Sequence, residues 1–421
     1  MKSKNYLSWV IASLVSLVFL FQNCKNQFSS QKVDLGSLNS GSASANSSYR
    51  TEFIDESGLT SLNYTAGPQD GSVLQRQANN KSDIVLSFDH LRGQYDAYFW
   101  QILKDSVVVE NSGIQHINTA TSSTLQPSAD KTATQIRVVF YKPGEYKPAA
   151  YWKSAKFYVG DVYIVAGQSN SANSGESPQK TQYKFNRGFN TETNTWSDLN
   201  DPVGTSSHWE MKSPGGENVF VKSSARIIGP GGSPWPLLAD RLADRSGVAV
   251  GITSIGWGGA TMSDWLNGGN ATYGKYLGLS DVSKAPALQN RLVEAFNRFP
   301  KCNFKSVLWI QGESDSYVQT DKDIYKNSVI KLKQDVDQKA GCSSIWYVAQ
   351  ASYMPPSFAV PIDKMNQIHI AQTEIQGLPN LGFRPGPDND SMIDALYRFD
   401  QLHFSNDGLL KNAEMWFDKL K

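Results

Sequence analysis

Residues 161–170, with the sequence Asp-Val-Tyr-Ile-Val-Ala-Gly-Gln-Ser-Asn, decide the fold of the larger part of the chain. The run from Val162 to Ala166 is apolar throughout, which is typical of a strand buried on both faces of a parallel sheet. Gly167 permits a tight turn after this strand, so Ser169 is presented at the strand tip. The same apolar character recurs in three more runs: Val248 to Ile255, Ser306 to Ile310 and Ile345 to Ala349. Together these runs predict a parallel sheet.

Segments between these runs have the apolar spacing of amphipathic helices. Ser233-Pro-Trp-Pro predicts a helix that starts with a cap and an early proline and that ends at Gly247. Further apolar stripes predict helices at Leu288 to Phe299, Tyr325 to Val336 and Asp407 to Leu420. Strands that alternate with helices are typical of an α/β fold, so we expect residues 160–421 to form a doubly wound α/β domain in three layers.

Residues 51–159 show a different pattern. Short runs rich in β-branched and aromatic residues are separated by turn pairs such as Gly67-Pro68 and Asp70-Gly71. The runs are Ile84 to Phe88, Ala97 to Leu103, Val107 to Val109 and Ile136 to Tyr141. We therefore expect a small all-β, sandwich-like domain before the α/β domain.

The first 50 residues contain a predicted export signal followed by a predicted linker. Lys2 and Lys4 precede an apolar run from Leu7 to Phe21, which is too short to span a membrane but has the length of a signal-peptide core. The run ends at Cys24, and residues 1–24 resemble a bacterial lipoprotein signal whose cysteine receives lipid, although Gln and Asn stand where small residues are usual. The alternative is a signal that ends near an ordinary cysteine. Residues 25–50 are rich in Ser, Asn and Gly and predict a flexible linker.

This N-terminus predicts an exported protein. We expect it to be held by the lipid anchor at the membrane of a bacterial cell envelope, in the periplasm or at the outer membrane, or to be secreted. In an oxidising compartment Cys302 and Cys342 can form a disulfide, because each stands just before a predicted strand and such strand starts can be neighbours. Two buried free thiols are the alternative.

Composition excludes several classes of function. The 421 residues include 40 Lys plus Arg and 39 Asp plus Glu, so the chain lacks the positive charge that a nucleic acid partner requires. Its three cysteines and five histidines form no CxxC, HxxxH or HExxH motif, so we expect no metal and no nucleotide cofactor.

Polar and glycine residues follow the predicted strands, which is where ligands bind in open α/β sheets. Ser169 follows the first strand, and a glycine cluster at residues 256–259 follows the second. Gln311 follows the third strand, and Asp400 and His403 lie three residues apart near the end of the chain. A nucleophilic serine needs a base, and the base needs a carboxylate that fixes its tautomer. Ser169, His403 and Asp400 fit these three roles.

Acyl transfer also needs hydrogen-bond donors for the tetrahedral oxyanion. The candidate donors are the backbone N–H of Ser169, an N–H of Gly258 or Gly259, and the side-chain amide of Gln311. A buried amide that satisfies loop backbone is the alternative for Gln311.

At these motifs the sequence resembles the SGNH/GDSL-type hydrolases, and more closely the sialate O-acetylesterase-like carbohydrate esterases. The similar stretches are Asp161 to Asn170, Ser233-Pro-Trp-Pro236, Gly256-Trp-Gly-Gly259 with Trp265, Trp309-Ile-Gln-Gly-Glu313, Asp400-Gln-Leu-His403 and, less closely, Gly71-Ser-Val-Leu-Gln-Arg76. The resemblance implies an SGNH-type three-layer fold, Ser169 as nucleophile, Asp400 and His403 as its helpers, and Gln311 where related enzymes carry an oxyanion asparagine. Ser171, where the family usually has Met, and the polar stretch from Lys184 to Glu217 depart from the pattern.

Three further residues are candidates for substrate binding, each with a structural alternative. Asn170 adjoins the nucleophile. Trp257 can stack on a sugar or pack as wall, since it is a large apolar residue beside a glycine turn. Glu313 can order the loop or serve as a second candidate for the triad acid.

The resemblance implies a serine esterase that removes O-acetyl groups from carbohydrate. The alternatives are an acetyltransferase or a cell-wall glycan O-acetylesterase with the same triad, and a non-catalytic carbohydrate-binding protein on the same fold.

Overall fold

The computed structural model describes residues 54–63, 67–117, 122–205 and 231–421. The predicted signal, Cys24 and the predicted linker lie outside the described residues. Tyr49–Lys421 form one compact unit. Among the described residues, no helix has both the length and the apolar character that a membrane crossing requires.

An eight-stranded sheet forms the centre of the α/β part, and β10 (Tyr158–Gly167) is its middle strand. β10 pairs in parallel with β13 (Ala249–Ser254) and with β14 (Ser306–Ile310). β15 (Trp346–Gln350) and β16 (Phe383–Asp388) extend the sheet, also in parallel. The four predicted strands are confirmed, and the carboxyl ends of these five strands lie along one edge.

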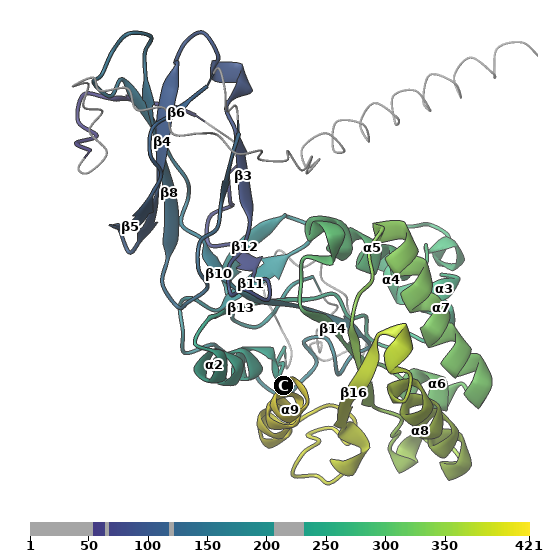
Figure 1. Ribbon diagram of the computed structural model, residues 1–421. Helices are drawn as coiled ribbons and strands as arrows, with labels where there is room; N and C mark the ends of the chain where they lie inside the picture. The colour runs from purple at the N-terminus through teal and green to yellow at the C-terminus, as the bar shows by residue number, and fades with distance from the viewer. Residues whose placement is uncertain (1–53, 64–66, 118–121, 206–230) are drawn as a thin grey trace, which may run out of the picture. The chain divides into compact units, whose positions relative to one another are not determined.

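Helices cover both faces of this sheet, which confirms the three-layer α/β fold. Along β10, Val162 and Ile164 enter one apolar core, whereas Tyr163 and Val165 enter the other. Figure 1 shows the two helical layers: α5 (Gln289–Arg298), α7 (Lys322–Ala340) and α8 (Ile362–Gln376) on one face, and α2 (Trp235–Ser246) and α9 (Asn406–Lys419) on the other.

The start of α2 differs slightly from the sequence-based expectation. Ser233 stands one residue before the cap position: its hydroxyl donates to the carboxylate of Asp201 and accepts only a long hydrogen bond from the Trp235 N–H (3.4 Å). Pro234 occupies the cap position instead. The predicted end is confirmed: Gly247 adopts a left-handed φ of 70° and closes α2.

Several elements were not predicted. β11 (Arg187–Asn190) and β12 (Thr195–Asp198) form a hairpin at one end of the sheet, inside the stretch that departs from the family pattern. β16 contains Pro385 and Gly386, which a strand tolerates at a sheet edge, and this composition hid it. Three helices of five or six residues are too short to leave a periodic signal: α3 (Met262–Leu266), α4 (Ala271–Tyr276) and α6 (Glu313–Tyr317).

The N-terminal part has two sheets that share one apolar core. Its longest strands, β4 (Ala97–Lys104) and β8 (Thr134–Tyr141), pair antiparallel in a six-stranded sheet. β3 (Ile84–Ser87) and β7 (Ser122–Leu125) form a separate two-stranded sheet, and both sheets contribute side chains to the same cluster. The other strands are β1 (Thr60–Ser61), β2 (Val73–Gln75), β5 (Val107–Asn111), β6 (Gln115–His116) and β9 (Ala150–Lys153).

β2 joins the N-terminal part to the central sheet, because it pairs in parallel with the start of β10. The side chain of Gln75 accepts a hydrogen bond from the Val162 N–H (2.8 Å). Arg76 donates two hydrogen bonds, each 2.8 Å, to the buried carboxylate of Asp161, and Lys305 adds a second cation. Burial opposes ionisation of Asp161, but Arg76 and Lys305 outweigh it and lower the pKa of the carboxyl. The two parts of the chain therefore share a strand and an ion cluster.

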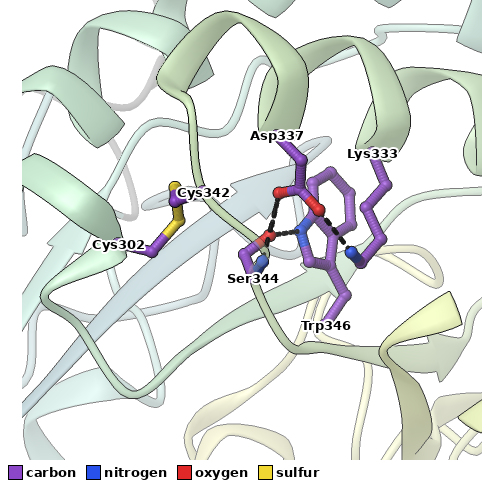
Figure 2. Close-up of a disulfide and its surroundings, with 6 residues drawn as sticks. All are labelled: Cys302, Lys333, Asp337, Cys342, Ser344 and Trp346. Atoms are coloured by element: carbon purple, nitrogen blue, oxygen red, sulfur yellow. Dashed lines mark hydrogen bonds and ion pairs between the residues drawn. A yellow bond between two sulfur atoms is a disulfide. The ribbon is translucent and has the colours of Figure 1, made fainter. Parts of the chain in front are cut away.

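A disulfide joins the ends of two helices on one face of the sheet (Figure 2). Cys302 follows α5, Cys342 follows α7, and their Cα atoms are 5.8 Å apart. Beside it, Asp337 accepts hydrogen bonds from Lys333 (2.6 Å) and from Ser344, whose hydroxyl accepts from the indole of Trp346 (2.9 Å). These contacts hold the end of α7 against the start of β15.

Replacing both cysteines, Cys302→Ser with Cys342→Ser, should lower the free energy of unfolding by about 4 kcal/mol, the chain-entropy value for a loop of this length. The bond closes a loop of 40 residues. Both cysteines precede strands, so they lie away from the edge that carries Ser169, and kcat should hold. Urea unfolding of the oxidised protein and the double variant measures the difference. A midpoint that does not move would contradict this account.

Candidate active site

Ser169 lies on a turn that only glycine permits. Gly167 has a φ of +132°, and a Cβ at this position would lie 1.8 Å from the carbonyl oxygen of Ile310. The Gln168 N–H donates to that same carbonyl (2.8 Å). β10 therefore ends in contact with the end of β14, and Ser169, which is 4% exposed, follows directly.

The back of this turn is closely packed. The Ser171 hydroxyl donates to the carbonyl of Gln168 (2.6 Å). A Cβ at Gly256 would come within 2.2 Å of that hydroxyl, so the glycine loop lies directly against the turn. The small Ser171 side chain thus stabilises the turn through this hydrogen bond. The resembling family usually has Met at this position.

Asp400 and His403 form a hydrogen-bonded pair. His403 Nδ1 lies 2.6 Å from Asp400 Oδ2, and Asp400 Oδ1 accepts the N–H of Leu402 (2.9 Å) and of His403 (2.6 Å). Burial opposes ionisation of Asp400, but the bonds from His403 and from these backbone groups lower the pKa of the carboxyl. An ionised Asp400 keeps the proton on His403 Nδ1, which leaves Nε2 free to accept one.

The loop of His403 lies against the turn of Ser169. Asn170 Nδ2 donates to the carbonyl of Leu402 (3.4 Å), and the Glu176 N–H donates to the carbonyl of Phe404 (2.9 Å). These bonds fall on either side of His403. Within the described part of the chain no hydrogen bond joins the side chains of Ser169 and His403. Such catalytic bonds are often long before substrate binds.

Arg398 also holds the loop of His403, and this role was not predicted from the sequence. Its buried guanidinium donates to three backbone carbonyls, those of Leu402 (2.6 Å), Met392 (2.7 Å) and Asn389 (2.9 Å). It also lies 4.3 Å from the ring centre of Phe404. Arg398 therefore contacts the residues on both sides of His403, the backbone of Leu402 and the ring of Phe404. An arginine between two aromatic residues, Tyr397 and Phe399, carries no sequence signal that separates it from a surface arginine.

Gln311 does not serve as predicted. Its Nε2 has three acceptors around it: Asp315 Oδ2 (2.5 Å), the carbonyl of Ala260 (3.1 Å) and Gln168 Oε1 (3.3 Å). An amide has two N–H groups, so no donor remains for an oxyanion. Gln311 is instead the buried amide that connects three loops, which was the alternative.

Glu313 is likewise buried and lies behind the site. Its Oε1 accepts from Asn170 Nδ2 (2.8 Å), and burial raises the pKa of the carboxyl. This contact makes Glu313 a positioning residue for Asn170 and leaves no exposed surface for a sugar. Asn170 itself is 4% exposed and bonds to protein groups on both sides. The expectation that these two residues bind substrate directly is therefore not supported by their contacts.

The indole of Trp257 belongs to the core. It is 1% exposed, packs edge-to-face on Tyr273 and Tyr276, and donates to the hydroxyl of Thr272 (3.0 Å). Stacking on a sugar would require an accessible face, so the prediction of a substrate role for Trp257 is wrong and the alternative, wall packing, holds.

The two glycines that are candidates for the second oxyanion donor differ in exposure. Gly258 is buried, whereas Gly259 is exposed and has a φ of +70°. Across the described ranges, the backbone N–H groups of Ser169 and Gly259 have no hydrogen-bond acceptor. Gly259 is thus favoured over Gly258 as the second donor beside Ser169.

A second histidine–aspartate pair joins helix α8 to the loop after β16. His369 Nδ1 is 3.0 Å from Asp390 Oδ2, and Asp388 brings a further ligand atom within 4.8 Å. Asp390 already accepts hydrogen bonds from the backbone N–H of Ser352 and Tyr353 and from the Ser352 hydroxyl. Because the oxygens of Asp390 already accept these bonds, we infer that the cluster connects the loops that follow β15 and β16.

The contacts of the two candidate acids predict different effects of their amides. Asp400→Asn should lower kcat for 4-nitrophenyl acetate by about 10²–10⁴-fold, because the amide cannot stabilise the imidazolium or hold its tautomer. Glu313→Gln should change kcat little, since a glutamine oxygen can still accept from Asn170. Steady-state kinetics of the two variants tests the assignment. A larger loss in Glu313→Gln than in Asp400→Asn would make Glu313 the triad acid.

A family model described as carbohydrate esterase, sialic acid-specific acetylesterase, matches residues 159–420. Similar solved structures include a carbohydrate acetylesterase from Xanthomonas citri, with 16% identity, a TM-score of 0.40, and 83% of this chain and 72% of that chain covered. A protein of Arabidopsis thaliana has 16% identity and a TM-score of 0.39, with 61% of this chain and 96% of that chain covered. No curated protein matches the chain. Because the family model covers more than half of the residues, including Ser169, Asp400 and His403, the chain belongs to the sialic acid-specific acetylesterase family of carbohydrate esterases, a family of ester hydrolases.

Proposed function

We propose that the chain is a serine esterase that removes O-acetyl groups from carbohydrate, with Ser169 as nucleophile, His403 as base and Asp400 as its orienting acid. One observation carries this proposal. The hydrogen-bonded Asp400–His403 pair belongs to a loop whose carbonyls on either side of the histidine accept hydrogen bonds from Asn170, next to Ser169, and from Glu176 further along the chain. Membership of the carbohydrate esterase family supports the choice of ester and of substrate class.

The first half of the reaction forms an acetyl-enzyme. His403 Nε2 takes the proton of the Ser169 hydroxyl while Oγ attacks the carbonyl carbon of the acetyl ester. The negative charge that develops on the carbonyl oxygen is stabilised by the N–H groups of Ser169 and Gly259. When the tetrahedral intermediate collapses, the bond to the sugar oxygen breaks, and His403 returns the proton to that oxygen.

The second half releases acetate. A water molecule replaces the sugar, and His403 Nε2 takes one of its protons as its oxygen attacks the acetyl group on Ser169. The ester bond to Ser169 then breaks, His403 returns the proton to Oγ, and acetic acid leaves, so the serine hydroxyl is restored. Throughout, the negative charge of Asp400 stabilises the imidazolium that forms on His403 in each half.

The full-length protein should release acetate from O-acetylated sugars, and Ser169→Ala should lower the rate by about 10⁴-fold or more. Acetate release from 4-nitrophenyl acetate and from a panel of O-acetylated sugars measures both proteins. The matched control is Ser174→Ala, which alters a nearby buried serine and should retain turnover. Equal rates in the parent and Ser169→Ala would refute the proposal.

The same assay separates the alternatives. A transferase would move the acetyl group to an added sugar acceptor in preference to water. A binding protein would retain affinity for the sugar without acetate release in either form. Either outcome would contradict the proposed esterase activity.

A further inference from the structure

Two exposed aromatic rings lie in contact at the edge of the sheet that carries the candidate site. Tyr317 is 53% exposed and Phe358 is 45% exposed. Their ring centres are 5.7 Å apart in an edge-to-face arrangement. Tyr317 ends α6, which follows β14, and Phe358 ends the short helix η4 (Pro356–Phe358), which follows the neighbouring strand β15. Clustered exposed apolar side chains, unlike isolated ones, mark binding surfaces.

α6 connects Tyr317 with the candidate nucleophile. Glu313 begins this helix and accepts a hydrogen bond from Asn170, the residue after Ser169. Tyr317 follows Glu313 by four residues, so the two side chains lie on one face of the helix, about 6 Å apart along its axis. Tyr317 is therefore one helical turn from the residue that holds the nucleophile turn.

The loop of Phe358 is connected with the other half of the candidate triad. The Ser352 N–H, in the same loop, donates to Asp390 (2.9 Å). The backbone carbonyl of Asn389, next to Asp390, accepts from Arg398, which also binds the carbonyl before His403. The aromatic pair thus stands where the loop after β14 and the loop after β15 meet, and each loop is bonded to one side of the candidate triad.

The chemistry of the pair favours a sugar ring as its ligand. A pyranose presents a face of C–H groups that packs on an aromatic ring, while the Tyr317 hydroxyl supplies a polar group for a sugar hydroxyl. We propose that Tyr317 and Phe358 form a subsite for a second sugar residue, next to the sugar whose acetyl ester reaches Ser169. The substrate class is then an acetylated oligosaccharide or polysaccharide. This inference rests on the proposed function.

The experiment compares chain lengths. Partially O-acetylated tetrasaccharides of xylose, glucose and N-acetylglucosamine are the probes, beside the corresponding O-acetylated single sugars. For the full-length protein, kcat/KM should be higher for at least one tetrasaccharide than for its single sugar. Tyr317→Ala and Phe358→Ala should each lower this ratio by about fivefold, the effect of one lost aromatic contact, mainly through KM. Tyr146→Ala, which alters a tyrosine that is also 53% exposed, should keep the ratio.

Three outcomes would overturn the subsite. The first is equal kcat/KM for each tetrasaccharide and its single sugar in the parent protein. The second is a ratio that survives both Ala substitutions, and the third is an equal loss in Tyr146→Ala. Calorimetric binding of the tetrasaccharides to Ser169→Ala, with and without Tyr317→Ala, tests the same surface without turnover. Acetate release that persists in Ser169→Ala would instead refute the proposed function, so the two failures are distinguishable.

Discussion

The contact between the ends of β10 and β14 determines how the candidate site is built. Gly167 approaches Ile310 so closely that any side chain would collide with its carbonyl oxygen. The same short segment also binds the glycine loop, because the Trp257 N–H donates to the carbonyl of Gly167 (2.9 Å). Three loops that follow different strands therefore converge on one peptide, and Ser169 stands directly after it. The strand order alone would place these loops at the same edge of the sheet. The contact between Gly167 and Ile310 brings them into direct contact with one another.

Buried polar side chains then fix the loops to one another. Gln168 Oε1 accepts from the backbone N–H of Gly312 (3.3 Å) and of Ser314 (3.1 Å), and Gln311 Nε2 donates to the carbonyl of Ala260. A buried donor or acceptor left without its partner costs about 1–3 kcal/mol, so the loops are held in one arrangement. Such rigidity suits a site whose donors must be in place before the negative charge forms.

The histidine loop is held differently, by a buried cation. Among the described residues, Arg398 donates to three backbone carbonyls and to no carboxylate, and it attracts the more distant charges of Glu313, Asp390 and Asp400. A buried charge is expensive to desolvate unless its hydrogen bonds are satisfied. Each of the three guanidinium nitrogens donates to one of these carbonyls, and the fixed fork geometry constrains the loop around His403.

Much of this architecture could be predicted from the sequence, because buried strands and amphipathic helices leave regular patterns. The position of Ser169 at one edge also follows from its place after a predicted strand. Asp400 and His403 were instead assigned from their spacing and the family resemblance, because β16, which precedes them, was not predicted. The directions in which the side chains point could not be predicted from the sequence. Gln311 stands at a strand end as predicted, but its neighbours Asp315 and Ala260 turn its amide inward, and neither contact has a sequence signal. Trp257 likewise turns into the core, because it packs on Tyr273 and Tyr276, and these contacts have no sequence signal either.

Labelling of the active serine tests the central claim most directly. A serine-directed organophosphonate, followed by intact-mass and peptide analysis of the full-length protein, should add one group per chain, on Ser169, with simultaneous loss of acetate release. The rate of labelling should fall sharply in His403→Ala, since the serine then has no base. Labelling at another residue, or full acetate release from protein that carries the group on Ser169, would contradict the account.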